Sequence, residues 1–406
     1  MAEGPAVDAA RVIGDLRELD RRTGGSGGAR RLCWGPEWRK ARAFLSELLD
    51  ELGLAPEHDE AGNLWAYLAG ESEPALALGS HLDSVPNGGW LDGALGVMAA
   101  LGVLRSWSQA GVPPPRTLAL VDWADEEGAR FGRSLFGSSA VAGTLDPSEL
   151  ERSSDSDGRA AAEVLAENDV DLQEAPRAAS RRERIAAYLE LHIEQGAVME
   201  AEGNRVAAVK GCVGIERHRL RISGQASHAG TTPMDRRHDA ALAAADAALR
   251  IERVAIESGG VATTGILDLR PGIATAVAGS AELVVDLRHE DAVSLEQMLT
   301  RVLKEAEEAA AARHCELDHG RIWGIEPVRF GLASVAVEVA DGGPLTSGAL
   351  HDAAEMARVR PAAMLFVPSK GGVSHAKEED TDEADLIAGI GAFGDLAGRV
   401  LRQLSG

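Results

Sequence analysis

The feature that most constrains the fold is an alternation of short apolar runs with helical stretches. Residues 64–69, 74–82, 116–125 and 186–193 are apolar enough for buried strands, and residues 93–107 have the composition of a buried helix. Strands that alternate with helices in this way are typical of an α/β domain. The sequence therefore predicts a mixed, mainly parallel sheet flanked by helices.

The N-terminal part adds two helices to this domain. Apolar residues recur at helical spacing in residues 6–21 and 37–52, and the glycine-rich stretch 22–30 between them predicts a flexible loop. The polar, acidic segment 146–186 predicts a loop that contains short helices.

The order of predicted strands and helices changes after about residue 212. The predicted elements are then, in order, a strand at 216–223, a helix at 236–255, strands at 262–269 and 281–289, a helix at 293–313 and a strand from residue 314. This β-α-β-β-α-β order is that of a ferredoxin-like α+β sandwich. The α/β order resumes with a helix that begins within 343–359, a strand at 362–368 and a closing helix at 383–403.

These patterns predict two domains, one of them discontinuous. We expect a catalytic domain formed by residues 1–212 plus 328–406, with a small ferredoxin-like domain inserted at 213–327.

Charge and cysteine content exclude several classes of protein. The chain has 64 acidic and 41 basic residues, a formal net charge of −23, which argues against binding to nucleic acid or to anionic lipid. The three cysteines are far apart and form no CxxC pair, so neither a disulfide scaffold nor a thiolate zinc site is expected. No apolar run reaches membrane-spanning length and the N-terminus does not resemble a signal peptide, which favours a cytoplasmic protein.

The first group of chemically active residues follows the predicted strand 74–82. His81 and Asp83 lie where that strand ends, and Asp92 follows in a glycine-rich turn that opens a helix. Strand ends of α/β sheets are where ligands bind, and a His with a nearby Asp can bind a divalent metal. Asp83 could orient the His81 ring through a hydrogen bond. Taken alone, these residues also fit an ordinary turn and helix cap.

A second group follows the strand 116–125. Glu126 and Glu127 are adjacent, and neighbouring buried carboxylates repel each other unless a cation or a proton intervenes. One of them could bind metal while the other acts as a general base. The alternative is a helix N-terminus, where acidic residues are also favoured.

Two further histidines complete the set. His192 lies inside the strand 186–193, and His375 lies in a glycine-rich loop after the strand 362–368. Each alone is compatible with a structural role, but together four strand-to-loop junctions supply His, Asp or Glu. Imidazole and carboxylate ligands suit Zn²⁺, Mn²⁺, Co²⁺ or Ni²⁺. Five such ligands with one shared carboxylate could hold two ions about 3.5–4 Å apart.

These segments resemble a known family of enzymes. The motifs, in family order, are HLDSVPNGG, DEEGARFG, LHIEQG, HAGTTPM, DLRH, SGALHD and a GG-x-SH loop. They are similar to those of the metal-dependent amidohydrolases that include N-carbamoyl-L-amino-acid hydrolases, allantoate amidohydrolases and β-ureidopropionases. This is a branch of the aminoacylase/carboxypeptidase-like dinuclear metallohydrolases, and the resemblance extends from about residue 30 to the C-terminus.

The resemblance implies a role for each matching residue. Two divalent ions per subunit would be bound by the ligands His81, Asp92, Glu127, His192 and His375, with Asp92 bridging them. Glu126 would be the general base, and His228 would stabilise the oxyanion. Arg288 would hold the substrate carboxylate, with Gln195 as a further polar contact.

The implied reaction is hydrolysis of a carbamoyl or ureido C–N bond, by a metal-bridged water, in an N-carbamoyl-L-amino acid or related small carboxylate. Allantoate hydrolysis and amide or N-acyl hydrolysis in a specialised pathway are the alternatives. A non-catalytic, metal-stabilised binding protein is disfavoured by the intact Glu126. The resemblance also implies a homodimer formed through the inserted lid domain, with His228 and Arg288 reaching the partner's active site.

Four positions depart from the family pattern. Thr275 stands where a substrate-binding Asn is usual, and Leu350 replaces a small residue, usually Gly. Asp380 replaces a commonly aromatic residue, and Trp90 stands where a basic or small residue is common. The metal and base positions all match, so these departures bear on the substrate and not on catalytic competence.

Overall fold

The computed structural model describes residues 4–405, which form two compact units. One unit contains the residues up to Gly211 together with those from Arg329 onward, and the other is Cys212–Val328. Among residues 4–405, no helix combines the length and the apolar surface that crossing a bilayer requires.

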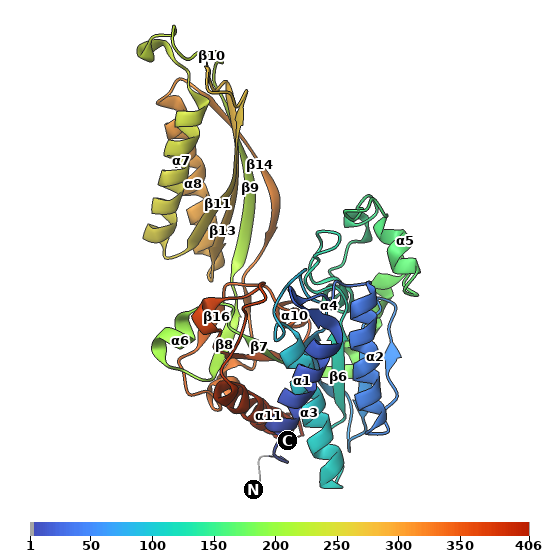
Figure 1. The fold of residues 1–406 in the computed structure, drawn as a ribbon. Coiled ribbons are helices and arrows are strands. Elements are labelled where there is room, and N and C mark those ends of the chain that lie inside the picture. The colour runs from blue at the N-terminus through green and yellow to red at the C-terminus, as the bar shows by residue number, and fades with distance from the viewer. Residues whose placement is uncertain (1–3, 406) are drawn as a thin grey trace. The chain divides into compact units, whose positions relative to one another are not determined.

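The first unit is built on a mixed, mainly parallel sheet, which confirms the predicted fold class (Figure 1). Its strand order is β15-β8-β17-β7-β5-β6-β4-β3, with β16 paired to β8. Strands β17, β7, β5 and β6 are parallel, whereas β8 pairs antiparallel with β17, β4 with β6, and β3 with β4. The strands are β3 (Glu57–His58), β4 (Leu64–Leu68), β5 (Ala75–His81), β6 (Leu118–Trp123), β7 (Ile185–Ile193), β8 (Ala207–Cys212), β15 (Val328–Arg329), β16 (Leu345–Ser347) and β17 (Ala362–Val367).

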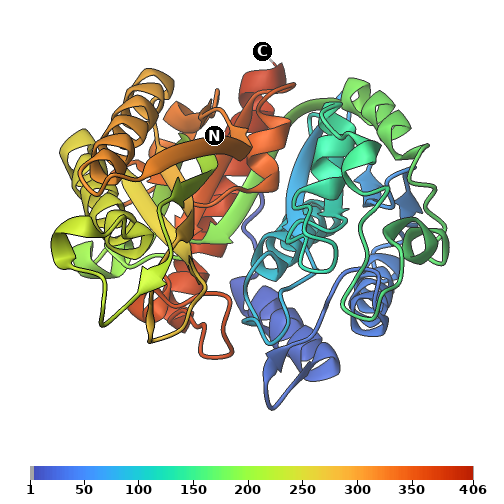
Figure 2. The same cartoon turned by 90° about the horizontal axis from the view of Figure 1, so that it is seen from above.

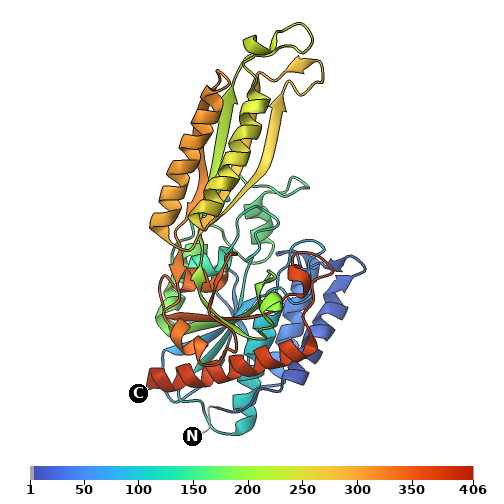
Figure 3. The same ribbon diagram turned by 90° about the vertical axis from the view of Figure 1, so that its left-hand side faces the viewer.

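The core of this unit lies along the central strands. Every residue of β5, β6 and β17 is buried, which requires cover on both faces of the sheet. Helices α3 (Ala94–Ala110) and α11 (Glu383–Ser405) pack against the sheet, and α1 (Ala9–Thr23) packs on both of them. Figure 3 shows α11, in red, as one long helix beneath the sheet.

A second group of helices packs against β6, β7 and β17. It consists of α4 (Phe136–Ala142), the 3₁₀ helix η2 (Ala175–Arg184) and α10 (Asp352–Met356). The remaining elements of the unit are β1 (Gly24–Gly25), β2 (Gly28–Ala29), α2 (Pro36–Asp50), η1 (Pro147–Glu149), α5 (Ala161–Ala166), α6 (Val198–Glu202), α9 (Ala333–Val337) and η4 (Lys370–Gly372).

The second unit is a four-stranded antiparallel sheet with two long helices on one face. Its elements are β9 (Gly214–Ser223), β10 (Ser227–His228), η3 (Met234–Arg236), α7 (Ala240–Ser258), β11 (Val261–Arg270), β12 (Ala276–Val277), β13 (Ser280–His289), α8 (Ala292–Ala311) and β14 (Glu316–Ile325). The sheet order β11-β13-β9-β14 is the ferredoxin-like arrangement that the sequence predicts. Figure 2 shows α7 and α8 of this unit in yellow and orange.

Alternation of side chains explains how this second sheet packs. In β9, Leu220 and Ile222 are fully buried under the helices, whereas Arg219 and Arg221, which alternate with them, are exposed. Both exposed arginines pair with Glu282 on β13. The pattern of a half-exposed strand predicted at 216–223 is therefore confirmed.

Some local predictions differ from the structure. Residues 343–359 are expected to begin a helix, but the chain forms the short strand β16 and only the five-residue helix α10. The sequence prediction also lacks β8, which pairs antiparallel with β17. The predicted loop 22–30 contains the small hairpin β1-β2.

Candidate metal centre

The predicted ligands come from the carboxyl ends of four parallel strands. His81 is the last residue of β5, Glu126 and Glu127 follow β6, His192 is near the end of β7, and the His375 loop follows β17. Parallel neighbours present these ends at the same edge of the sheet. The fold thus brings together residues that are far apart in the chain, with His81 and His375 separated by 294 positions.

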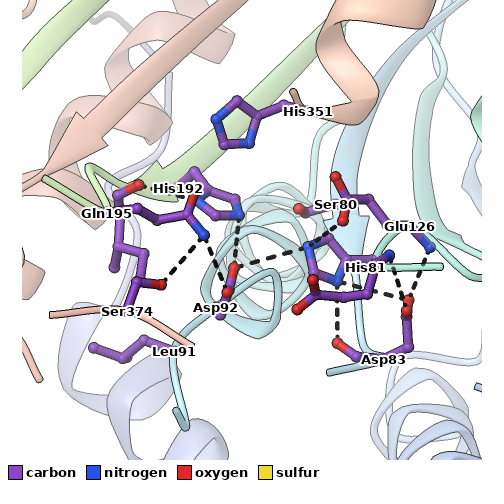
Figure 4. Close-up of polar contacts among 12 residues, drawn as sticks. Ser80, His81, Asp83, Leu91, Asp92, Glu126, His192, Gln195, His351 and Ser374 are labelled. Atoms are coloured by element: carbon purple, nitrogen blue, oxygen red, sulfur yellow. Dashed lines mark hydrogen bonds and ion pairs between the residues drawn. The ribbon is translucent and has the colours of Figure 1, made fainter. Parts of the chain in front are cut away.

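Asp92 lies at the centre of the group (Figure 4). Its Oδ1 is 3.1 Å from Nε2 of His192 and 3.9 Å from Nε2 of His81. Its Oδ2 is 3.3 Å from Nε2 of His375, which is in turn 3.5 Å from Oε2 of Glu127. One carboxylate is therefore shared between two ligand groups, His81–Asp92–His192 and Asp92–Glu127–His375.

The donor set fits divalent cations. In each group, one ligand atom per residue lies within 4.8 Å of the others, which is the separation expected around a single ion. Nε2 of His192 is buried and forms no hydrogen bond, although Asp92 Oδ1 is 3.1 Å away. The other nitrogen of this ring, Nδ1, contacts the carbonyl oxygen of Ile193 at 3.0 Å, so Nε2 is left available as a ligand atom.

Close packing holds His81 against the start of helix α3. Gly93 directly precedes the helix with a φ of +64°, and a Cβ there would come within 2.4–2.5 Å of the His81 ring. Only glycine fits this position. The turn that carries Asp92 can therefore approach the His81 ring directly.

Two ligand-loop residues adopt left-handed backbone conformations that side chains rarely take. Gln195 has a φ of +59° and His375 a φ of +55°. Such strain persists only where the surrounding structure enforces it, and it clusters at functional sites.

The two adjacent glutamates have different surroundings. Oε1 of Glu127 accepts a hydrogen bond from the backbone N–H of Val85 at 3.2 Å, and its Oε2 faces His375. Oε2 of Glu126 instead lies 3.6 Å from Nε2 of His81. Burial, followed by the negative charges of Asp352 and Glu127, raises the pKa of Glu126 well above its ordinary value. Burial and the charge of Asp92 raise the pKa of Glu127 to about 7.

Asp83 contacts the His81 ring through a different atom from the one expected. The His81 ring nitrogen Nδ1 contacts the backbone carbonyl of Asp83 at 3.1 Å, whereas the Asp83 carboxylate is 3.6 Å away. That carboxylate accepts hydrogen bonds from the backbone N–H groups of Glu126 and Glu127, each at 3.2 Å. Asp83 therefore fixes the loop that carries both glutamates, and its main chain, not its carboxylate, bonds the ring.

Gln195 joins the group from the loop after β7. Its Nε2 donates to Asp92 Oδ2 at 3.1 Å and to Ser374 Oγ at 3.3 Å. It also lies 3.5 Å from Nε2 of His375. In this arrangement its amide is bonded to a predicted ligand, so its expected contact with substrate stays a prediction.

The remaining predicted site residues belong to the second unit, and the sheet register separates them. His228 on β10 is level with Ala276 on β12, and Thr275 accepts a hydrogen bond from Ala229, so His228 and Thr275 lie at one end of that unit. Arg288 pairs with Ile215, at the end where the chain enters β9. Ser280 and Arg288 are eight residues apart along β13, a separation that spans roughly 27 Å at about 3.4 Å per residue.

The positions that depart from the family pattern have ordinary local contacts. Asp380 forms an ion pair with Lys370 at 2.8 Å. Trp90 is half-buried against the core of the first unit, and Leu350 is half-exposed beside the buried His351.

One residue that sequence reasoning missed contacts two of the ligand loops. Glu379 is buried and bonds the backbone of both Asp92 and His375. No sequence signal distinguishes it, because it lies in the acidic run 378–380, which by itself suggests only a solvated surface.

Comparison with known proteins agrees with this geometry. The model of peptidase family M20/M25/M40 matches residues 77–399. The chain is 38% identical over 377 residues to the N-carbamoyl-L-amino acid amidohydrolase of Geobacillus stearothermophilus, covering 90% of this chain and 91% of that one. It is 33% identical over 377 residues to the allantoate amidohydrolase of Escherichia coli, with 90% and 91% covered. The crystal structure of a hydantoinase/carbamoylase family amidase from Burkholderia multivorans superposes with a TM-score of 0.87 at 30% identity, covering 97% and 98% of the two chains.

Proposed function

Because this chain belongs to peptidase family M20/M25/M40, and within it to the hydantoinase/carbamoylase amidases, we propose that it hydrolyses the carbamoyl C–N bond of an N-carbamoyl-L-amino acid. Membership of this metal-dependent family confirms the resemblance found in the motifs. The chain is an amidohydrolase of the N-carbamoyl-L-amino acid/allantoate amidohydrolase group, and the proposal concerns which small-molecule amide it takes.

The observation that carries the proposal is the pair of ligand groups that share Asp92, with Glu126 beside them. Two bound divalent ions would supply a polarised carbonyl and an acidified water. The ligands we assign to them are His81, Asp92, Glu127, His192 and His375.

Glu126 is the residue we assign as general base. It is buried, its carboxylate faces the His81 side of the group, and it accepts no hydrogen bond that would tie up the proton-accepting oxygen near His81. Burial and neighbouring charges that raise its pKa make it a stronger proton acceptor. It can take a proton from the attacking water and deliver it to the leaving nitrogen.

His228 is assigned as the oxyanion donor because of its tautomer. Its Nδ1 accepts hydrogen bonds from the backbone N–H groups of Gly230 at 3.0 Å and Thr231 at 3.2 Å. The ring, when neutral, therefore carries its proton on Nε2, and the residue is exposed. An Nε2–H donor suits a carbonyl oxygen that gains negative charge during the reaction.

Arg288 is assigned to the substrate carboxylate. Its Nε donates to Asp286 Oδ1 at 2.7 Å, and Arg217 donates to Asp286 Oδ2, also at 2.7 Å. Asp286 therefore orients the Arg288 guanidinium from behind. A planar guanidinium so held can bind a carboxylate through two parallel hydrogen bonds.

We further propose a homodimer in which the inserted unit, as dimerisation and lid domain, completes the active site of the partner. The support comes from within that unit. His228 lies on the separate two-stranded sheet β10-β12, and β12 ends three residues before β13 begins at Ser280. Arg288 lies near the other end of β13, roughly 27 Å from Ser280 at about 3.4 Å per residue. A carbamoyl amino acid is small compared with this separation. In place of both residues reaching across, we therefore propose that the partner supplies His228 and that Arg288 comes from the other chain.

The substrate assignment is tested by a parallel assay. Purified protein loaded with Mn²⁺ is given N-carbamoyl-L-amino acids, allantoate and N-acetyl-L-amino acids, and released ammonia or free amine is measured. The highest kcat/KM is expected with an N-carbamoyl-L-amino acid. A higher kcat/KM with allantoate would identify an allantoate amidohydrolase, and a higher value with an N-acetyl substrate would identify an N-acyl hydrolase. If none of the substrates is turned over, the protein would be a binding protein.

A further inference from the structure

Glu379 connects two loops of the first unit that are far apart in sequence. Its Oε1 accepts hydrogen bonds from the backbone N–H groups of Leu91 at 3.3 Å and Asp92 at 3.0 Å. Its Oε2 accepts from Ser374 Oγ at 2.9 Å and from the backbone N–H of His375 at 3.3 Å. All four donors therefore converge on a single carboxylate.

Glu379 is buried, and the loop at Gly89 packs closely against its side chain. Only 2% of the residue is exposed, so its hydrogen bonds do not compete with water. A Cβ on Gly89 would lie 2.0–2.5 Å from Oε1, Cδ and Cβ of Glu379, and the loop can approach this closely only because residue 89 is glycine. Its neighbour Glu378 has none of these features: it is exposed and forms only a 3.8 Å ion pair with Lys377.

We infer that Glu379 is a positioning residue that holds Asp92 and His375 in register with each other before any metal binds. The carboxylate bonds the main chain of both residues and leaves their side chains directed at each other, with 3.3 Å between Asp92 Oδ2 and His375 Nε2. The inference rests on the proposed function only in calling these two residues metal ligands. The link between the loops is a property of the protein itself.

The two oxygens of the Glu379 carboxylate bond different loops, so a substitution can affect one loop and spare the other. In a Glu379→Gln variant, the amide oxygen can still accept from Leu91 and Asp92, and the amide N–H₂ can donate to the Ser374 hydroxyl, which can reverse its role. The amide cannot accept from the N–H of His375. The glutamine should therefore release the His375 loop and keep the Asp92 turn, whereas Glu379→Ala should release both.

The direct test is backbone hydrogen exchange in metal-free protein. Exchange at Leu91, Asp92 and His375 should speed up by about 10- to 100-fold in Glu379→Ala, the usual factor for losing a hydrogen bond to a charged group. In Glu379→Gln only His375 should change, and in the matched control Glu378→Gln none of the three should. Unchanged exchange at Leu91 and Asp92 in Glu379→Ala would overturn the inference, and so would equal effects at both loops in Glu379→Gln.

A second measurement uses Mn²⁺ alone, titrated into metal-free protein and followed by calorimetry. Glu379→Gln should weaken one of two binding steps, that of the His375 group, by about 10-fold or more and leave the other within about twofold. Equal weakening of both steps, or of neither, would contradict the inference. If wild-type protein binds no Mn²⁺, the proposed function fails, and hydrogen exchange in the metal-free protein still decides the role of Glu379.

Discussion

At the scale of single residues, Glu126 and Glu127 are neighbours in sequence, but their surroundings suit different roles: general base for Glu126 and metal ligand for Glu127. Glu127 is directed at His375 and is fixed by the N–H of Val85, which suits a ligand. Glu126 faces His81 from within the protein, and burial raises its pKa, which suits a base. Asp83 supports both through their backbone N–H groups.

This difference predicts that the two isosteric variants fail in different ways. Glu126→Gln should keep the fold and the metal content but lose about 10²–10⁴ in kcat, the range for a general acid–base residue. Glu127→Gln should lose metal first. Circular dichroism, elemental analysis and steady-state kinetics check the pair. A Glu126→Gln enzyme within about threefold of wild type would mean that the base lies elsewhere.

The ligand set also predicts that metal is essential. Removing divalent ions with a chelator should abolish hydrolysis, because Glu126 as general base would then face a water whose pKa no metal ion lowers. Adding back Mn²⁺, Co²⁺, Ni²⁺ or Zn²⁺ should restore it. Activity that persists in protein shown by elemental analysis to be metal-free would refute this.

At the scale of elements, the placement of α3 determines where Asp92 lies. The helix begins two residues after Asp92 and packs on the sheet through Gly96, where a Cβ would lie 2.6 Å from the carbonyl oxygen of Leu191 and 2.7 Å from Cβ of Ser80. Gly14 on α1 provides a contrast, because nothing lies within 4 Å of a Cβ at that position.

The contrast predicts opposite effects of the same substitution. Gly96→Ala should lower the free energy of unfolding by about 1–2 kcal/mol, because overpacking outweighs the gain in helix propensity. It should also weaken metal binding by displacing Asp92. Gly14→Ala should instead raise stability by about 0.5–1 kcal/mol. Denaturant unfolding of the metal-free proteins measures both, and a Gly96→Ala protein as stable as Gly14→Ala would show that the helix has room to move.

Elements with a regular period were predictable from the sequence, and those without one were not. The alternation at 216–223 and the helical spacing at 293–313 correspond to β9 and α8, because each has one buried and one exposed face. Residues 343–359 contain apolar residues without such a face. The helix α10 that forms there is buried along its whole length, and the strand β16 before it pairs with β8, a partner far away in sequence.

The same limit applies to the site. His81, Asp92 and Glu126 were identifiable because each follows an apolar strand or opens a helix, where chain-local signals suffice. Glu379 was not, because its partners Leu91 and Asp92 are 288 and 287 residues away. Tertiary hydrogen bonds to the main chain leave no trace in the sequence of either segment.

At the scale of the whole molecule, two copies of the chain are proposed to share each active site. This predicts complementation between inactive variants. His228→Ala protein mixed with Glu126→Gln protein, under conditions that exchange subunits, should regain up to about a quarter of wild-type activity. Half of the dimers are then mixed, and each mixed dimer has one intact site.

A matched control uses two variants of the first unit. Mixing Glu126→Gln with Glu127→Gln leaves every site with one altered glutamate, so no activity should return. Failure of the first mixture to exceed this control would contradict the shared site, as would a fully active monomer in light scattering.

The discontinuous first unit has a consequence for how the protein is made. Strand β17, which lies between β7 and β8 in the sheet, and the loop that carries His375 come from the last part of the chain. The continuous segment Cys212–Val328 leaves the ribosome before them and can fold as a unit on its own. The stretch from Cys212 to Ala362 takes roughly 8 to 30 s to synthesise at about 5–20 residues per second. For that time β7 and β8 lack their shared partner strand β17, so each presents an unpaired edge that could pair with another chain.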